Sequence, residues 1–112
     1  MSFFKSILYE LKFLIKYKGF KFQCPFCNKW YRQFYPGGNK GDCFDKHIII
    51  GSGYRKNVFC PNCGSKDRER LVYLYLKNKI PVQTQGLKVL HVAPEPSLRD
   101  YLTNKKNIEY YE

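Results

Sequence analysis

The chain has 112 residues, of which 44% are hydrophobic and 18% aromatic, and its formal net charge is +11. This composition excludes an intrinsically disordered chain, and the length limits it to one domain, or to a small domain with part of another. The basic surface is compatible with RNA, anionic lipid or an acidic protein as partner.

Residues 2–18 are predicted to form an amphipathic helix that ends at Gly19. Its apolar residues recur at helical spacing, and its lysines fall together on another side. The apolar set is Phe3, Phe4, Ile7, Leu8, Leu11, Leu14 and Ile15, and the lysines are Lys5, Lys12 and Lys16. We expect the apolar side to pack against the rest of the protein; the alternative is weak contact with an anionic membrane surface. The segment carries too many charges for a membrane-spanning helix or a secretory signal.

Two cysteine pairs with the spacing Cys-x-x-Cys are the strongest chemical signal in the chain. They are formed by Cys24 with Cys27 and by Cys60 with Cys63. Four thiolates in two such steps are what a tetrahedral structural Zn²⁺ ion requires; the alternative is two disulfides or free thiols. Bound zinc would reduce the net charge to about +9, because four thiolates and one Zn²⁺ add two negative charges. Thiols that serve as metal ligands fit a reducing, cytoplasmic location.

Residues near the two cysteine pairs could shape the metal site or supply further ligands. Asn28 and Gly64, which follow the pairs, tolerate a left-handed backbone conformation that would turn main-chain N–H groups toward the sulfurs. Cys43 and His47 lie between the pairs and could replace a ligand or bind a second ion. No further pair of ligands accompanies them, so we predict that neither binds metal.

Residues 20–64 are therefore predicted to form a zinc ribbon. Its short strands are expected at residues 20–23, 30–35, 47–50 and 55–59, with a loop at 36–41. Aromatic side chains interleave with basic ones in this region and could stack on RNA bases, although such aromatics more often form the small core of a ribbon. The aromatic residues are Trp30, Tyr31, Phe34, Tyr35 and Phe44, and the basic residues are Arg32, Arg55 and Lys56.

Residues 65–86 are predicted to contain a linking helix and a loop. Ser65 is expected to cap the helix, with Asp67 in the first turn where the helix dipole is positive, and Pro81 is expected to stop it. Arg68 and Arg70 lie near that first turn and oppose the dipole, which indicates an acidic partner or a carbonyl of the second cysteine pair as their contact; the alternative is a surface ion pair. The apolar residues form one stripe, with Leu71, Leu74 and Tyr75.

Residues 87–112 have the pattern strand, turn, helix, strand, which is the opening of a parallel α/β sheet. The first strand is expected at 87–93 and the second at 108–111. Ser97 is expected to cap the short helix in a capping box with Asp100. A parallel sheet must be covered on both faces. We therefore expect the remaining parts of such a sheet to lie beyond Glu112, or a second polypeptide to complete it.

Most of residues 24–112 resemble a bacterial family of class I S-adenosylmethionine-dependent methyltransferases that carry an N-terminal zinc ribbon. The resemblance rests on Arg-Lys-Asn at 55–57, CPNCGSKDRERLVYLYL at 60–76 and LKVLHVAPEPSL at 87–98. The expected fold class is α+β. It comprises an amphipathic helix over 1–19, a zinc ribbon over 20–64, a linking helix and loop over 65–86, and an incomplete, Rossmann-like β-α-β start of a methyltransferase sheet over 87–112.

The resemblance also implies residues that contact the cofactor S-adenosylmethionine. They are His91, Ala93, Pro94, Glu95 and Glu112. Ligands of such sheets bind at the carboxyl ends of the strands. Glu95 would accept from the cofactor's ammonium group, free N–H groups before the short helix would meet its carboxylate, and Glu112 would bind the ribose hydroxyls. The glycine-rich turn usual in this class is absent, because alanine and proline stand in its place.

The expected function is that of the N-terminal part of a methyltransferase that is inactive alone. No residue can be named as a catalytic base, and no measurable binding of S-adenosylmethionine is expected in calorimetry. The methyl acceptor could be RNA, protein, a sugar or a lipid-linked glycan. The alternative function is a stand-alone zinc-ribbon module that binds RNA, which predicts an affinity that falls steeply with salt.

Overall fold

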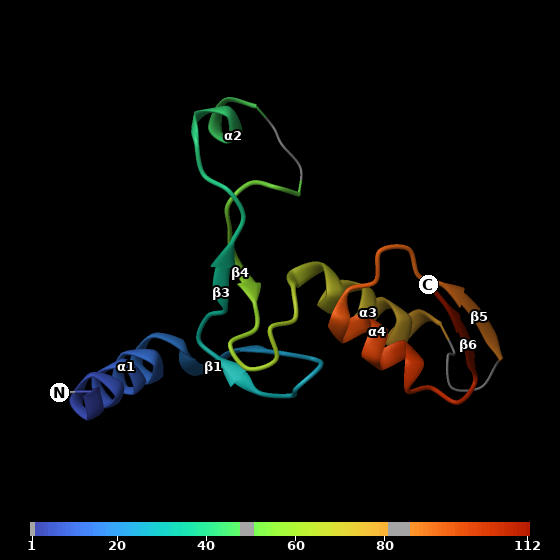
Figure 1. Cartoon of the computed structure of the whole chain (residues 1–112), viewed down its shortest axis with the longest axis horizontal. Coiled ribbons are helices and arrows are strands. Elements are labelled where there is room, and N and C mark those ends of the chain that lie inside the picture. The colour runs from blue at the N-terminus through green and yellow to red at the C-terminus, as the bar shows by residue number, and fades with distance from the viewer. Residues whose placement is uncertain (1, 48–50, 81–85) are drawn as a thin grey trace.

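The computed structural model describes residues 2–47, 51–80 and 86–112. Within them the chain forms a mixed α+β fold with three two-stranded sheets. The molecule is elongated, with extents of 54 × 39 × 26 Å. Figure 1 shows helix α1 at one end, strands β1, β3 and β4 in the middle, and a group made of α3, α4, β5 and β6 at the other end. The predicted α+β class is confirmed.

Helix α1 spans Ser2–Tyr17, as predicted. Only its C-terminal part packs on the body, through the rings of Phe13 and Tyr17, whose centroids lie 6.3 and 4.6 Å from that of Tyr35. The expectation that the apolar side packs against the protein is wrong for most of its length. Phe4 and Ile15 are 74% and 70% exposed, and Ile7, Leu8 and Leu11 are exposed as well.

The cysteine-bearing part consists of two antiparallel strand pairs. Strand β1 (Lys18–Gln23) pairs with β2 (Trp30–Tyr31), and β3 (Tyr35–Gly37) pairs with β4 (Arg55–Phe59). The single strand predicted at 30–35 is thus two strands. The short helix α2 (Asp42–Lys46) was not predicted, and residues 48–50 of the strand predicted at 47–50 lie outside the described residues.

A small core lies beside the cysteines. It consists of the buried residues Cys24, Tyr31, Phe34 and Cys60, with Phe13, Tyr17, Phe22, Phe26 and Cys27 packed against it. Phe34 leaves the strand direction because its N–H donates to the side-chain oxygen of Asn57 at 2.8 Å. Two of the aromatic side chains considered for base stacking, Tyr31 and Phe34, therefore belong to the core.

Helix α3 spans Asp67–Lys79, and its N-cap is Lys66. The prediction that Ser65 caps this helix is wrong. The stripe with Leu71, Leu74 and Tyr75 is exposed, whereas the buried residues of the helix are Glu69 and Arg70. Pro81, the expected stop, lies outside the described residues.

Strand β5 (Leu87–Leu90), helix α4 (Pro96–Thr103) and strand β6 (Ile108–Tyr111) form the parallel unit that the sequence predicts. The strands pair in register from Leu87 with Ile108 to Leu90 with Tyr111. Strand β5 is shorter than expected. The N-cap of α4 is Glu95, with Pro96 at the first helical position, so the predicted capping box of Ser97 and Asp100 is wrong.

Candidate metal centre and the turn after strand β5

The side chains of the two cysteine pairs meet at one point. The sulfur atoms of Cys24, Cys27, Cys60 and Cys63 all lie within 4.8 Å of one another. The sulfurs of Cys24 and Cys63 are 3.6 Å apart, and those of Cys27 and Cys60 are 3.7 Å apart. In a tetrahedral site with Zn–S distances of about 2.3 Å, neighbouring sulfurs are separated by about 3.8 Å. The four sulfurs are therefore spaced to hold a metal ion such as zinc.

Two matching turns position these sulfurs. The first cysteine turn comprises residues 24–29 and the second comprises residues 60–65. In each turn the first cysteine donates its N–H to the last residue's carbonyl, at 3.0 Å in both, and its own carbonyl accepts from Asn28 or Gly64, at 2.8 and 3.0 Å. Asn28 and Gly64 have φ angles of 57° and 70°, so the predicted left-handed conformation is confirmed.

The surroundings of the cysteines affect their thiols differently. Burial raises the pKa of Cys24, but hydrogen bonds from the Ser65 hydroxyl and from the N–H groups of Cys27 and Phe26 outweigh it and bring the pKa down from 9.0 to about 7. Burial raises the pKa of Cys60 to about 12. Metal ligands must be thiolates, so a bound cation would have to offset the cost of ionising Cys60.

The side chain of Ser65 contacts the cysteine sulfurs. This contact was not predicted from the sequence. Ser65 is fully buried, and its Oγ is 3.5 Å from the sulfur of Cys24 and 3.2 Å from that of Cys63. The Ser65 hydroxyl thus lies against the sulfurs of Cys24 and Cys63, while the Ser65 carbonyl accepts the Cys60 N–H that closes the second cysteine turn. The local pattern of Ser65 before a helix matches an N-cap, and this similarity concealed its contact with the sulfurs.

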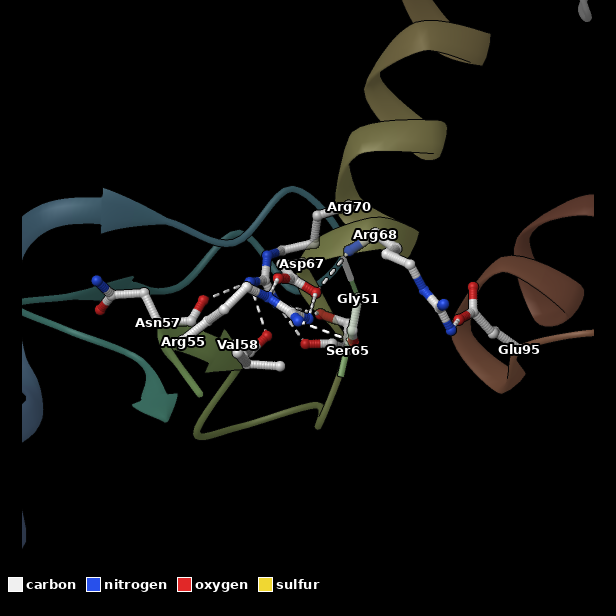
Figure 2. A network of polar contacts seen from close by, with 9 residues as sticks. All are labelled: Gly51, Arg55, Asn57, Val58, Ser65, Asp67, Arg68, Arg70 and Glu95. Carbon is white, nitrogen blue, oxygen red and sulfur yellow. Dashed lines mark hydrogen bonds and ion pairs between the residues drawn. The ribbon is translucent and has the colours of Figure 1, made fainter. Parts of the chain in front are cut away.

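Arg70 joins helix α3 to strand β4 and the second cysteine turn (Figure 2). Its guanidinium, in a residue only 8% exposed, donates to the carbonyls of Asn57 and Val58 at 3.0 and 2.9 Å and also to the carbonyl of Ser65. It also stacks over the ring of Phe34, 4.5 Å from the centroid. The predicted contact of Arg70 with a carbonyl of the cysteine turn is confirmed.

Arg55 and Asp67 form a second link between β4 and α3, also drawn in Figure 2. The Arg55 Nε and Nη2 atoms donate to the two carboxylate oxygens at 2.9 and 3.3 Å. Burial raises the pKa of Asp67, but the bonds from Arg55 and from the Arg68 N–H hold that pKa below its usual value. The orientation of α3 relative to the cysteine group is therefore fixed at several points.

Glu69 connects the two helices that follow the cysteine group. Its side chain is buried, with the residue 2% exposed. One carboxylate oxygen accepts from the Lys66 N–H at 2.7 Å, and the other accepts from the Ser97 N–H at 3.0 Å. A single carboxylate thus satisfies free N–H groups at the N-termini of α3 and α4, where helix dipoles favour negative charge.

The residues predicted to contact a cofactor lie at one edge of the β5–β6 sheet. His91, Ala93, Pro94 and Glu95 follow β5, Glu112 follows β6, and the His91 N–H donates to the Tyr111 carbonyl at 2.8 Å. The Nδ1 atom of His91 lies 2.9 Å from the Tyr110 hydroxyl. Ala93 has a φ of 52°, a left-handed conformation that glycine adopts more readily.

Both predicted cofactor carboxylates are paired within the chain. Glu95 pairs with Arg68 at 2.7 Å (Figure 2), so the acidic partner of Arg68 is part of an exposed ion pair, and Glu112 pairs with Arg99. The Ser97 N–H, one of the groups expected to be free before α4, is occupied by Glu69. A ligand that used these groups would have to exchange with these partners.

The remaining candidates, considered as further metal ligands or for RNA contact, lie outside these two sites. Cys43 is exposed in α2, and the group of possible metal ligands found among the described residues is made of Cys24, Cys27, Cys60 and Cys63, without Cys43 or His47. Of the residues considered for RNA contact, Arg55 is paired with Asp67 and Tyr35 contacts α1, while Trp30 is 45% exposed. RNA binding itself stays a prediction.

The chain was also compared with known proteins. No protein-family model matches it, and neither a curated protein nor a solved structure matches it significantly.

Proposed function

We propose that this chain is the zinc-binding N-terminal part of an S-adenosylmethionine-dependent methyltransferase. The observation that carries the proposal is that helix α3 connects the four-cysteine group to the β5–α4–β6 unit. Arg68 and Glu69 lie in the first turn of α3. Arg68 contacts Glu95, the N-cap of α4, and Glu69 accepts from the N–H of Ser97 in the first turn of α4. The two segments with the most specific family resemblance are therefore in contact with each other.

In this proposal the zinc ribbon is structural. The four cysteines would hold the ion, and Zn²⁺ would link the two cysteine turns and neutralise part of the thiolate charge. All four tetrahedral positions are then filled by protein sulfurs, which leaves no position for a reacting water or substrate. The role of the centre is to fix the start of α3, and through it the turn after β5.

The turn after β5 would bind the amino-acid part of S-adenosylmethionine. Glu95 would accept from the ammonium group after leaving Arg68, and Glu112 would bind the ribose hydroxyls after leaving Arg99. The ion pair with Arg68 is weak, because the Arg68 side chain is 67% exposed and such pairs contribute only about 0–1 kcal/mol. The left-handed φ of Ala93 gives the turn a glycine-like backbone at the edge where ligands of parallel sheets bind.

The cofactor contact can be tested by nuclear magnetic resonance on the zinc-loaded, ¹⁵N-labelled chain. Binding too weak for calorimetry should still be seen in this experiment. We expect millimolar S-adenosylhomocysteine to shift the non-proline amides of residues 91–97 and that of Glu112, and adenosine alone to leave 91–97 unchanged because it lacks the amino-acid part. Glu95→Ala should weaken the response about tenfold, since a charge-assisted hydrogen bond is lost. Glu109→Ala, which removes an exposed carboxylate from β6, serves as the matched control.

The result that would contradict the proposal is equally specific. If S-adenosylhomocysteine shifts no amide at this edge, or if the two glutamate variants respond alike, the turn after β5 does not bind the cofactor.

A further inference from the structure

Helix α1 exposes a long apolar side to solvent. Figure 1 shows the helix extending away from the body of the molecule, toward the N-terminus. At about 100° per residue, its exposed aliphatic residues and Phe4 fall in one arc of the helix surface, whereas the exposed Tyr9 lies outside it. They are Phe4, Ile7, Leu8, Leu11 and Ile15. The residues that hold the helix to the body, Phe13 and Tyr17, lie on the opposite side, so packing onto the body leaves the arc uncovered.

A row of lysines borders this apolar arc. Lys5, Lys12 and Lys16 follow one another along one edge of it, and all three are exposed. The helix contains a single acidic residue, Glu10, on the other edge, and two more lysines, Lys18 and Lys21, follow directly in β1. Long lysine side chains at the edge of an apolar face can reach anionic groups while the face itself is buried.

We propose that α1 lies in the surface of an anionic lipid bilayer. An apolar arc bordered by lysines is complementary to a surface that has acyl chains below a layer of negative headgroups. A second copy of the chain fits less well, because each copy is strongly basic, with a formal net charge of +11, or about +9 with zinc bound. The helix would lie on the bilayer, since within the described residues no helix is long and apolar enough to cross one.

This inference is independent of the proposed methyltransferase function, because it concerns residues before the cysteine group. It also predicts an orientation. The side of α1 with Phe13 and Tyr17 would face away from the lipid, toward β3, so the remainder of the protein would sit on the aqueous side. Bound to a bilayer, α1 would be the part of the described chain closest to the acyl chains.

Vesicle flotation tests the proposal on the full chain. We expect the chain to float with vesicles of phosphatidylcholine and phosphatidylglycerol, and to bind pure phosphatidylcholine at least about tenfold more weakly. Ile15→Glu should reduce binding to the anionic vesicles by at least about tenfold, because it puts a charge in the apolar arc. Changing Lys5, Lys12 and Lys16 together to Gln should cost about fivefold for each lysine.

Leu71→Glu is the matched control, because Leu71 and Ile15 are equally exposed, at 70%, on different helices. We expect it to bind like the unaltered chain, and circular dichroism should show that both variants remain folded. Three results would overturn the proposal: no flotation with anionic vesicles, equal losses from Ile15→Glu and Leu71→Glu, or a dimer in light scattering that Ile15→Glu dissociates. The last result would assign the arc to a second copy.

Discussion

Arg70 is a buried cation whose partners are neutral carbonyls. Its planar guanidinium reaches carbonyls of β4 and of the second cysteine turn at the same time, and its face covers Phe34. Arginine suits this position because several of its donors are held in one plane, whereas a lysine is a single point charge. The sequence indicated such a contact for Arg70, since a basic residue near a helix N-terminus needs a reason to be there.

We therefore expect Arg70→Lys to lower the free energy of unfolding by about 1–3 kcal/mol, because buried carbonyls would lose their donors. The measurement is urea denaturation of the zinc-loaded chain, followed by circular dichroism. Arg32→Lys is the control, because the Arg32 side chain is exposed, and it should change the midpoint little. Equal losses in the two variants would mean that the carbonyl contacts of Arg70 do not stabilise the fold.

Helices α3 and α4 depend on each other at their N-termini. Their N-caps are Lys66 and Glu95, one and two residues away from the serines that the sequence suggested as caps. Ser65 is used by the cysteine group instead, and the Ser97 N–H is satisfied by Glu69 from the neighbouring helix. Capping rules describe contacts within one helix, so a cap supplied by another helix could not be predicted from local sequence.

For some other elements, local sequence patterns were sufficient to predict the secondary structure. The strands at 55–59 and 108–111 were predicted with their observed bounds, because each is a short run rich in β-forming residues next to a turn signal. The strand predicted at 30–35 was wrong because Asn57, which is distant in sequence, takes the N–H of Phe34. That the four cysteines come together could be predicted from their spacing alone. The exposure of α1 could not, because it depends on which side of the helix packs against the body.

Glu69→Gln is expected to uncouple α3 from α4. The glutamine amide would have one carbonyl oxygen for two N–H donors, and its NH₂ group would face the other donor. We expect a loss of about 1–3 kcal/mol in the free energy of unfolding and faster hydrogen exchange at either Lys66 or Ser97. Glu109→Gln, on exposed β6, is the control for exchange and stability. Unchanged exchange at both amides in Glu69→Gln would show that the carboxylate bridge has no such role.

At the scale of the whole molecule, little apolar surface supports the cysteine-bearing part. Its core consists of a few aromatic side chains beside Cys24 and Cys60, and its strands are short. Such a small core rarely stabilises a fold alone, and a bound structural metal is the usual remedy. The β5–α4–β6 unit lies apart from this core and contacts it through α3 (Figure 1).

We expect the purified chain to contain one zinc ion per molecule, and a strong chelator to unfold the cysteine-bearing part. Elemental analysis and circular dichroism measure the two effects. Cys27→Ser should abolish stoichiometric zinc, because it removes one of the four ligands, whereas Cys43→Ser should retain it as the matched control. A folded chain without zinc, whose spectrum the chelator leaves unchanged, would contradict the metal centre and the ribbon with it.

The arm formed by β3, α2 and β4 has a consequence for how this chain can vary among organisms. Figure 1 places α2 at the far end of this arm, away from β1 and α3. The entropy of closing a loop rises only with the logarithm of its length, by about 0.6 kcal/mol for each doubling. Insertions or deletions at the tip of the arm should therefore be nearly neutral, so this stretch is free to diversify while the spacing inside each cysteine turn stays fixed.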